Sequence, residues 1–325
     1  MDTIPPARFG RSTCFLCGRR LGTRNRSDED VVPKWVQRQF ELGNQLLHLP
    51  NNTTIRYRQL KIPCCRECNN EHLSRIELRV EQAVQSGPEA VKVLDPLVLF
   101  LWLGKIFYGL MYRDFLLLRD RRDPRRGPIL RRSVIEQFEG HKFFLQAARR
   151  QFEFKPELPA SIFVFRTQVP ENVRARGALN DALEPMTISF RMGSVGILAA
   201  LQDGGAQRLT HSEHLARYQD IALHPIQFAE LTAKFFYKGS LLNRVPKFLS
   251  VLGDSRIVVT QMPIGGFSTR PLFNVWDWAV YARVLAKYTD LPIENLYQPP
   301  QGVWSWLDDG HGGIPQLDFD SFPFG

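Results

Sequence analysis

The sequence predicts an α+β protein in two parts: a small zinc-stabilised domain over residues 1–92 and a larger α+β domain over 93–325. Four of the five cysteines form two Cys-x-x-Cys pairs in the first part, and this arrangement is typical of two knuckles that hold one zinc ion. The second part opens with a long apolar helical pattern, so its first half is expected to be helical. It continues with short β-branched runs bounded by Gly, Pro and Asp, which predict strands.

The two cysteine pairs are Cys14/Cys17 and Cys65/Cys68. Cys64 adjoins the second pair and could replace one of its members with one extra residue of spacing. We prefer Cys65, because Cys65-x-x-Cys68 repeats the spacing of the first pair. The four thiolates are expected to bind one structural Zn²⁺, since a domain of this size has too little core to fold without it.

Composition points to a polyanionic partner in a reducing compartment. The net charge is +9 and the pI is about 9.5, and nucleic acid is the commonest partner of such a basic chain. The alternative is a basic protein whose charge serves only solvation. Cysteines paired for metal binding and the lack of a secretion pattern at the amino terminus favour a cytoplasmic protein.

One stretch, Pro96 to Leu118, is apolar enough to raise the question of a membrane span. It carries Lys105, Arg113 and Asp114. Charges near the middle of a span each cost roughly 2.5 to 3.5 kcal/mol even on the lenient insertion scale. A buried core helix is therefore the better interpretation, and no membrane partner is expected.

Three elements are predicted in the first part. Pro33 opens a short helix over 33–40, which Gly43 closes. A strand over 51–63 leads the chain to Cys65. After Cys68, apolar residues recur at helical spacing until Ser86-Gly87-Pro88 ends the helix.

The second part begins with a helix that starts at Pro96, reaches residue 112 or beyond and is expected to be central in that domain. Residues 119–132 hold seven Arg and two Asp with Pro and Gly between them, so they form an exposed basic loop that either contacts nucleic acid or is only solvated. Further helices are predicted over 134–152, 225–237 and 276–288, and strands over 161–165, 186–190, 195–201 and 256–260.

Strand, second cysteine knuckle and helix in immediate succession resemble the ββα-metal finger of the HNH-type endonucleases. The resemblance covers only the first quarter of the chain. In that family a His at the end of the first strand activates water, an Asn holds the intervening loop, and a His or Asn on the helix binds a divalent metal. Phosphodiester cleavage needs a base near neutral pH and a hard cation at the phosphate, and this arrangement supplies both.

The resemblance implies three catalytic positions. Asp30 stands where the family has its first His, and its carboxylate could act as a base with a raised pKa or bind the catalytic metal directly. Asn69 matches the metal-binding position at the start of the helix. His72 follows three residues later on the same helical face, where it could be a second ligand or the base. The middle Asn has no clear counterpart, and Gln59 is the nearest candidate.

The resemblance therefore implies a metal-dependent endonuclease that cleaves nucleic acid, DNA rather than RNA, with Mg²⁺ or Mn²⁺ as the catalytic ion. Chains of this shape look like the accessory nucleases of bacterial antiphage defence or mobile elements. The alternative is a catalytically inactive finger that remains a zinc-binding module for nucleic acid or protein. Residues 93–325 could recognise a protein partner, and their His211-x-x-His214 pair is interpreted as incidental because no third ligand accompanies it.

Overall fold

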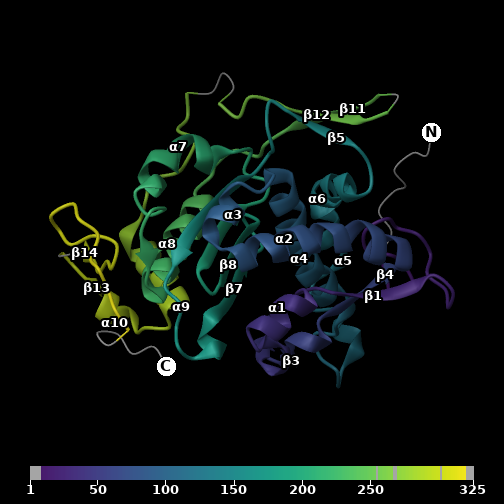
Figure 1. Ribbon diagram of the computed structural model, residues 1–325, viewed down its shortest axis with the longest axis horizontal. Helices are drawn as coiled ribbons and strands as arrows, with labels where there is room; N and C mark the ends of the chain where they lie inside the picture. The colour runs from purple at the N-terminus through teal and green to yellow at the C-terminus, as the bar shows by residue number, and fades with distance from the viewer. Residues whose placement is uncertain (1–8, 254, 266–268, 301, 320–325) are drawn as a thin grey trace. The chain divides into compact units, whose positions relative to one another are not determined.

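The computed structural model describes residues 9–253, 255–265, 269–300 and 302–319 (Figure 1). Its residues fall into two compact units that alternate along the chain. Unit 1 comprises Met1–Gln85, Leu94–Glu153 and Val251–Val258, and unit 2 comprises Ser86–Val93, Phe154–Ser250 and Val259–Gly325. These units are sets of neighbouring residues and leave the predicted division into 1–92 and 93–325 untested.

Unit 1 contains an antiparallel pair of strands, β1 (Arg26–Asp30) and β4 (Lys61–Cys65), in which Asp30 lies opposite Lys61. Between them come helix α1 (Lys34–Gln39), the turn η1 (Leu42–Asn44) and a small hairpin of β2 (Leu46–His48) and β3 (Thr54–Arg56). The predicted strand over 51–63 is interrupted by the 3₁₀ turn η2 (Tyr57–Gln59). The Gln59 side chain accepts a hydrogen bond from the Arg56 amide, which fixes that turn.

A helix follows the second cysteine pair, as the apolar spacing predicts. It begins as a π-helical turn, η3 (Cys68–Leu73), and continues as α2 (Ser74–Ser86). Gly87 then adopts a φ of 101°, which glycine tolerates without steric cost, and the chain enters the short helix α3 (Pro88–Lys92).

Helix α4 (Pro96–Leu116) is capped by Asp95, whose side chain accepts a hydrogen bond from the Leu97 amide. This helix lies in unit 1, and its expected central place in the second domain stays a prediction. A Cβ on Gly109 would stand 3.0 Å from Val31 Cγ1, so glycine allows the helix to approach the β1–β4 pair closely. The face of α4 that carries Gly109 therefore packs against Val31 and Ile62.

The chain after α4 differs from the prediction. The basic loop over 119–132 contains one 3₁₀ turn, η4 (Pro124–Arg126). The predicted continuous helix over 134–152 is wrong, because α5 (Arg132–Ile135) and α6 (Glu139–Phe144) alternate with the 3₁₀ turns η5 (Glu136–Phe138) and η6 (Leu145–Ala148). Gln146 donates to the Leu16 carbonyl at 2.7 Å, a tertiary contact of the kind that overrides helix propensity.

Unit 2 contains a five-stranded sheet of order β10-β6-β9-β8-β7. The four longer strands are antiparallel neighbours, and the short β10 runs parallel to β6. Their bounds are β6 Ser161–Thr167, β7 Gly177–Ala182, β8 Thr187–Met192, β9 Val195–Ala200 and β10 Ala222–Leu223. The sequence predicts β6, β8 and β9 but misses β7, whose residues include no β-branched side chain.

Three helices complete the main part of unit 2: α7 (Ala206–Ala216), α8 (Pro225–Ser240) and α9 (Trp278–Thr289). Phe228 of α8 packs against β9, where Gly196 leaves room for its ring, since a Cβ there would stand 2.5 Å from Phe228 Cε2. Ile226 and Tyr237 of α8 share a buried cluster with Tyr281 of α9. Together these contacts hold α8 between the sheet and α9.

The remaining elements are short. Strands β5 (Phe152–Lys155), β11 (Phe248–Leu252) and β12 (Ile257–Gln261) form a sheet of order β11-β12-β5, and α10 (Ile293–Leu296) precedes the pair β13 (Tyr297–Gln298) and β14 (Gly302–Val303). Among the described residues, no helix has the length and apolar character that crossing a membrane requires. The η7 turn (Val173–Arg176) leads into β7.

Candidate functional site

Four buried cysteines come together at the amino-terminal end of unit 1. The Sγ atoms of Cys14, Cys17, Cys65 and Cys68 all lie within 4.8 Å of one another, and those of Cys17 and Cys65 are 3.8 Å apart. A tetrahedral zinc site with Zn–S bonds of about 2.3 Å requires sulfur atoms separated by about 3.8 Å. The cluster could therefore hold a metal ion such as zinc, as the spacing of the two pairs predicts.

Local structure places these thiols. Cys14 and Cys17 flank a tight turn in which the Gly18 amide donates to the Cys14 carbonyl and Gly18 has a φ of 72°. Cys65 ends β4 and Cys68 begins η3, where the Cys68 amide donates to Cys65 Sγ. Each pair thus presents two sulfur atoms from one turn of backbone.

Cys64 lies beside the cluster without belonging to it. Its Sγ is 3.8 Å from Cys14 Sγ and it is fully buried, yet the group of four that could hold a metal contains Cys65. Cys64 thus contacts the cluster, but the four sulfur atoms that lie within reach of one ion are those of Cys14, Cys17, Cys65 and Cys68. The preference for Cys65 over Cys64 agrees with this geometry.

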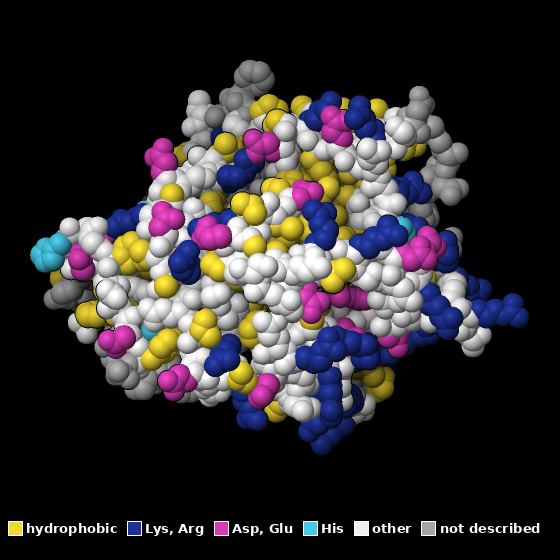
Figure 2. All heavy atoms as spheres, in the orientation of Figure 1, with side chains coloured by type: hydrophobic (Ala, Val, Ile, Leu, Met, Phe, Trp, Pro, Cys, Tyr) yellow, Lys and Arg dark blue, Asp and Glu magenta, His cyan; other side chains and the backbone are white. Residues whose placement is uncertain are grey.

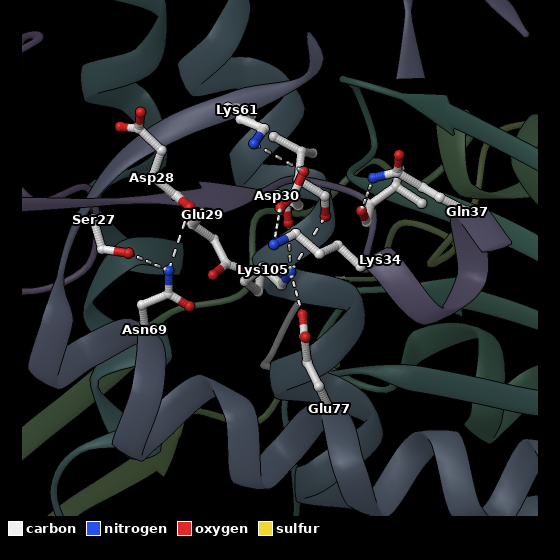
Figure 3. A network of polar contacts seen from close by, with 12 residues as sticks. Ser27, Asp28, Glu29, Asp30, Lys34, Gln37, Lys61, Asn69, Glu77 and Lys105 are labelled. Atoms are coloured by element: carbon white, nitrogen blue, oxygen red, sulfur yellow. Dashed lines mark hydrogen bonds and ion pairs between the residues drawn. The ribbon is translucent and has the colours of Figure 1, made fainter. Parts of the chain in front are cut away.

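Asp30 is the last residue of β1 and lies between two lysines (Figure 3). Its carboxylate is 3.8 Å from the ammonium of Lys34, the first residue of α1, and 3.9 Å from that of Lys61, its partner across the strands. The Asp30 side chain is 11% exposed, whereas those of Lys34 and Lys61 are 71% and 45% exposed. The predicted catalytic carboxylate therefore has two cationic neighbours that extend into solvent.

A buried lysine from α4 fills the space behind Asp30. The Lys105 ammonium lies 2.6 Å from Glu29 Oε1 and 2.7 Å from Glu77 Oε1, and it donates to the Asp30 carbonyl at 3.0 Å. Figure 3 shows Glu29 approaching it from the strand and Glu77 from helix α2. These oxygen atoms surround the ammonium much as carboxylates and carbonyls surround a hard metal cation.

The electrostatics of this group follow from two carboxylates sharing one ammonium. Burial raises the pKa of Glu29 to about 7, and the charge of Glu77 acts in the same direction. Burial by itself lowers the pKa of Lys105, but the two carboxylates outweigh it and the pKa is raised. Lys105 therefore stays charged at neutral pH.

The other two predicted catalytic residues lie on the π-helical turn η3. Asn69 Nδ2 donates to Ser27 Oγ at 2.8 Å and to the Asp28 carbonyl at 3.3 Å, so it fastens the start of the helix to β1. His72 Nε2 is 3.7 Å from a carboxylate oxygen of Glu67 on the same segment.

Asp30, Asn69 and His72 share no hydrogen bond or ion pair within the described part of the chain. Each contacts other residues instead. Their catalytic roles, which rest on the resemblance to HNH-type endonucleases, stay predictions.

Basic side chains surround the Asp30 end of the β1–β4 pair. Arg113 donates to the Lys61 carbonyl at 3.1 Å. Burial lowers the pKa of Arg113, and the nearby charges of Arg11 and Arg121 lower it further, so these guanidinium groups lie close enough to repel one another. We call the residues Arg11, Lys34, Lys61, Arg113 and Arg121 the basic surface.

The basic loop over 119–132 is fixed to the β2–β3 turn. Asn51 Nδ2 donates to the Arg119 carbonyl at 3.1 Å, which brings the loop beside residues far earlier in the chain. On the face drawn in Figure 2, Lys and Arg side chains gather at the lower edge, over the region that Figure 1 labels β3. Positive charge from separate segments thus collects on unit 1.

Sequence analysis missed Lys105, Glu77 and Gln37 as parts of this site. Gln37 Nε2 donates to the Val32 carbonyl at 2.7 Å and so holds the loop that follows Asp30. A signal for Lys105 did exist, because a lysine in the middle of an apolar helix needs a buried partner. From the sequence alone, Lys105 serves only as a charge that argues against a membrane span.

Comparisons of the chain with models of protein families, with curated proteins and with solved structures found no match. Its function has to be argued from the residues and their geometry. Three features of unit 1 bear on its function: the four-cysteine cluster, the Lys105 group and the basic surface.

Proposed function

We propose that the amino-terminal finger is a zinc-stabilised module that binds nucleic acid through its basic surface and does not cleave it by the HNH mechanism. This is the alternative that the sequence left open, namely an HNH-derived fold that keeps its zinc and has lost its catalysis. The position of the Lys105 ammonium, between Glu29 and Glu77, carries the proposal.

The positive charges around Asp30 oppose binding of a catalytic metal ion. A divalent cation beside Asp30 would need carboxylates, and the two behind Asp30, from Glu29 and Glu77, already pair with an ammonium at 2.6 and 2.7 Å. Bringing Mg²⁺ or Mn²⁺ there would force two positive charges together in a buried space or expel Lys105 from its partners, and either change is costly. Asp30 itself faces Lys34 and Lys61, which weaken its attraction for another cation.

Nucleic-acid binding is supported by the positive charges of the basic surface. The basic surface draws on the segment before the zinc knuckle, α1, β4, α4 and the loop after it, and four of its five residues are exposed. Such a surface neutralises phosphates without reading bases, so it binds DNA or RNA with little sequence preference. We expect DNA rather than RNA, in keeping with the finger that the sequence resembles.

An active nuclease is the second candidate, and the position of Asp30 favours it. Asp30 ends the first strand of a strand pair that leads into a helix, as the first catalytic residue of an HNH finger does. The lysines beside it are exposed and could turn toward a bound phosphate, with Mg²⁺ or Mn²⁺ held by Asp30, Asn69 and His72. In that case a role in bacterial antiphage defence, with residues 93–325 recognising a protein partner, would also call for a test.

Plasmid nicking separates the two candidates. Purified full-length protein is incubated with supercoiled plasmid and Mg²⁺ or Mn²⁺, with EDTA as the control, and binding is measured in parallel by gel shift. We expect binding without nicking. Nicking that EDTA stops and that Asp30→Ala abolishes, while Asp28→Ala on the same strand leaves it unchanged, would replace our proposal with the nuclease. Nicking that survives Asp30→Ala would place the catalytic centre elsewhere, with His72 next to be tested.

Charge reversal tests the binding surface. Lys61→Glu with Arg121→Glu should lower affinity for unrelated DNA sequences equally and reduce the salt slope by about one for each phosphate that the protein no longer neutralises. The matched control is Arg283→Glu on α9, an exposed arginine outside the basic surface. Affinity that does not change between about 50 and 200 mM salt would mean that the charge serves only solvation.

A further inference from the structure

A cavity of about 380 Å³ opens in unit 2 between α7, α8 and the start of α9. Its polar and aromatic lining includes Gln207, His211, His214, Lys238, Trp276 and Trp278. The volume lies at the lower end of the range for small-molecule sites. A single small molecule, rather than a polymer, is therefore the class of ligand that fits.

Gln207 lines this cavity from the first turn of α7. Its side chain is almost fully buried, and Nε2 has no hydrogen-bond partner among the described residues. The backbone amide of Gln207 donates to Asp203, which caps the helix and fixes the residue in place.

Basic side chains face the cavity from two helices. His211 and His214 are one turn apart on α7, and Lys234 and Lys238 are one turn apart on α8. Lys234 pairs with Glu230 at 2.8 Å, but Lys238 has no carboxylate partner in the described ranges and lies 4.3 Å from the centre of the Phe273 ring. None of the residues lining the cavity is acidic.

This charge distribution favours a phosphate over a carboxylate as the anionic group. A phosphate offers several acceptor oxygens and up to two negative charges, which suits donors that approach from more than one helix. The histidine pair, interpreted from the sequence as incidental, thus lies beside two lysines rather than beside a third metal ligand. Burial lowers the pKa of His211 to about 4, and the charge of Lys238 acts in the same direction, so the ring is neutral at neutral pH and the positive charge at the cavity comes from the lysines.

Two indole rings supply a surface for a flat group. Trp276 is held in the wall by Tyr237 and Tyr281, whose ring centres lie 4.6 and 4.9 Å away. Trp278 is 58% exposed and lies 5.9 Å from Trp276, so part of its ring is open to solvent. Nucleic-acid bases stack on aromatic side chains of this kind, whatever the base, because every base has a flat π-face.

We infer that this cavity binds a nucleoside monophosphate, with the phosphate at Lys238 and the base against Trp276 and Trp278. The inference concerns unit 2 alone and does not depend on the function proposed for the finger.

The test is equilibrium binding to the full-length protein, followed by calorimetry or tryptophan fluorescence. The probes are AMP, GMP, CMP and UMP, with each nucleoside and inorganic phosphate as separate arms. We expect at least one nucleotide to bind at least tenfold more tightly than its nucleoside and than inorganic phosphate, because both halves of the site then contribute.

Matched variants locate the binding. Lys238→Met should weaken nucleotide binding at least tenfold, whereas Lys287→Met, which removes another lysine that lies over an aromatic ring, should not. Trp278→Leu should weaken it as well, with the equally exposed Trp304→Leu as its control.

Three outcomes would overturn the inference. The first is that none of the four nucleotides binds at about 1 mM, a concentration at which even weak specific sites are occupied. The second is that binding persists unchanged in Lys238→Met. The third is that binding is lost on Lys61→Glu with Arg121→Glu, which would assign it to the basic surface of the finger.

Discussion

The finger and the cavity of unit 2 both bring cationic side chains together with groups that could hold a ligand, but they differ in what remains unsatisfied. In the finger, the Lys105 ammonium already has Glu29 and Glu77 as partners. In the cavity, Lys238 has no carboxylate partner among the described residues and the Gln207 amide nitrogen has no acceptor there. Both regions contain a lysine that could bind an anionic group, but only the lysine of the cavity lacks a carboxylate partner among the described residues.

The difference has an energetic basis. A buried lysine between two carboxylates is part of the folded structure, because removing it strands charge in a medium that solvates it poorly. A half-exposed lysine over an aromatic ring contributes little to folding and is free to bind an anion. Replacing the lysine by Met should therefore lower stability in the first region and weaken ligand binding in the second.

The largest effect is expected at the four-cysteine cluster, because binding of a structural metal is coupled to folding. Cys65→Ser should abolish stoichiometric zinc and unfold the finger, because binding of a structural zinc contributes about 10 to 16 kcal/mol in small zinc domains. Zinc analysis and thermal unfolding measure both effects. Cys64→Ser is the control, and it should keep the zinc. A Cys65→Ser variant with full zinc content would rule out the cluster as the site.

Lys105→Met sharpens the comparison directly. It should lower the free energy of unfolding by about 3 to 5 kcal/mol, since Glu29 would remain buried, and Glu77 partly buried, without their cation. Lys238→Met should change it by no more than about 0.5 kcal/mol, as for other substitutions outside such networks. Chemical denaturation of both variants gives the two values.

A rescue variant shows whether charge is the cause. Adding Glu29→Gln and Glu77→Gln to Lys105→Met should restore much of the lost stability, because the carboxylates that needed a cation are then replaced by neutral amides. Equal losses in Lys105→Met and Lys238→Met would remove the contrast between the two regions.

The sequence predicted the parts of the finger that depend on local spacing. The two cysteine pairs, the helix over 33–40 and the helix after Cys68 follow from patterns within a few residues. The partners of Asp30 could not be predicted in this way. Lys61 reaches it through strand register, and Lys105 approaches the same strand end from a helix about 75 residues later in the chain.

The larger domain shows the same limit. Strands β6, β8 and β9 were predicted from their β-branched residues, whereas β7 forms because β8 offers an edge to pair with. Helix α7 carries few apolar residues and its histidines looked incidental. Their place in a binding site becomes visible only with Lys234 and Lys238 of α8, which line the same cavity.

A smaller effect is expected from pH. Because burial raises the pKa of Glu29 from 4.5 to about 7, the folded protein binds a proton there more tightly than the unfolded chain does. This contribution to stability is complete below about pH 4.5 and is lost as pH rises through about 7. The loss is at most about 3 kcal/mol, since one pKa unit corresponds to about 1.4 kcal/mol. Glu29→Gln should flatten the profile between these limits, and an unchanged profile would show that Glu29 does not titrate there.

The smallest effect is expected at Asn69, which the resemblance assigns to a catalytic metal and the geometry assigns to a structural contact. Asn69→Ala removes the hydrogen bonds to Ser27 Oγ and to the Asp28 carbonyl, so stability should fall by about 1 to 1.5 kcal/mol, the usual net value of such bonds. Asn70→Ala is the control, since Asn70 is the exposed neighbour of the same residue type. If Asn69→Ala leaves stability unchanged but abolishes a metal-dependent cleavage, Asn69 serves the metal after all, and the finger joins the cavity as a region with groups available for a ligand.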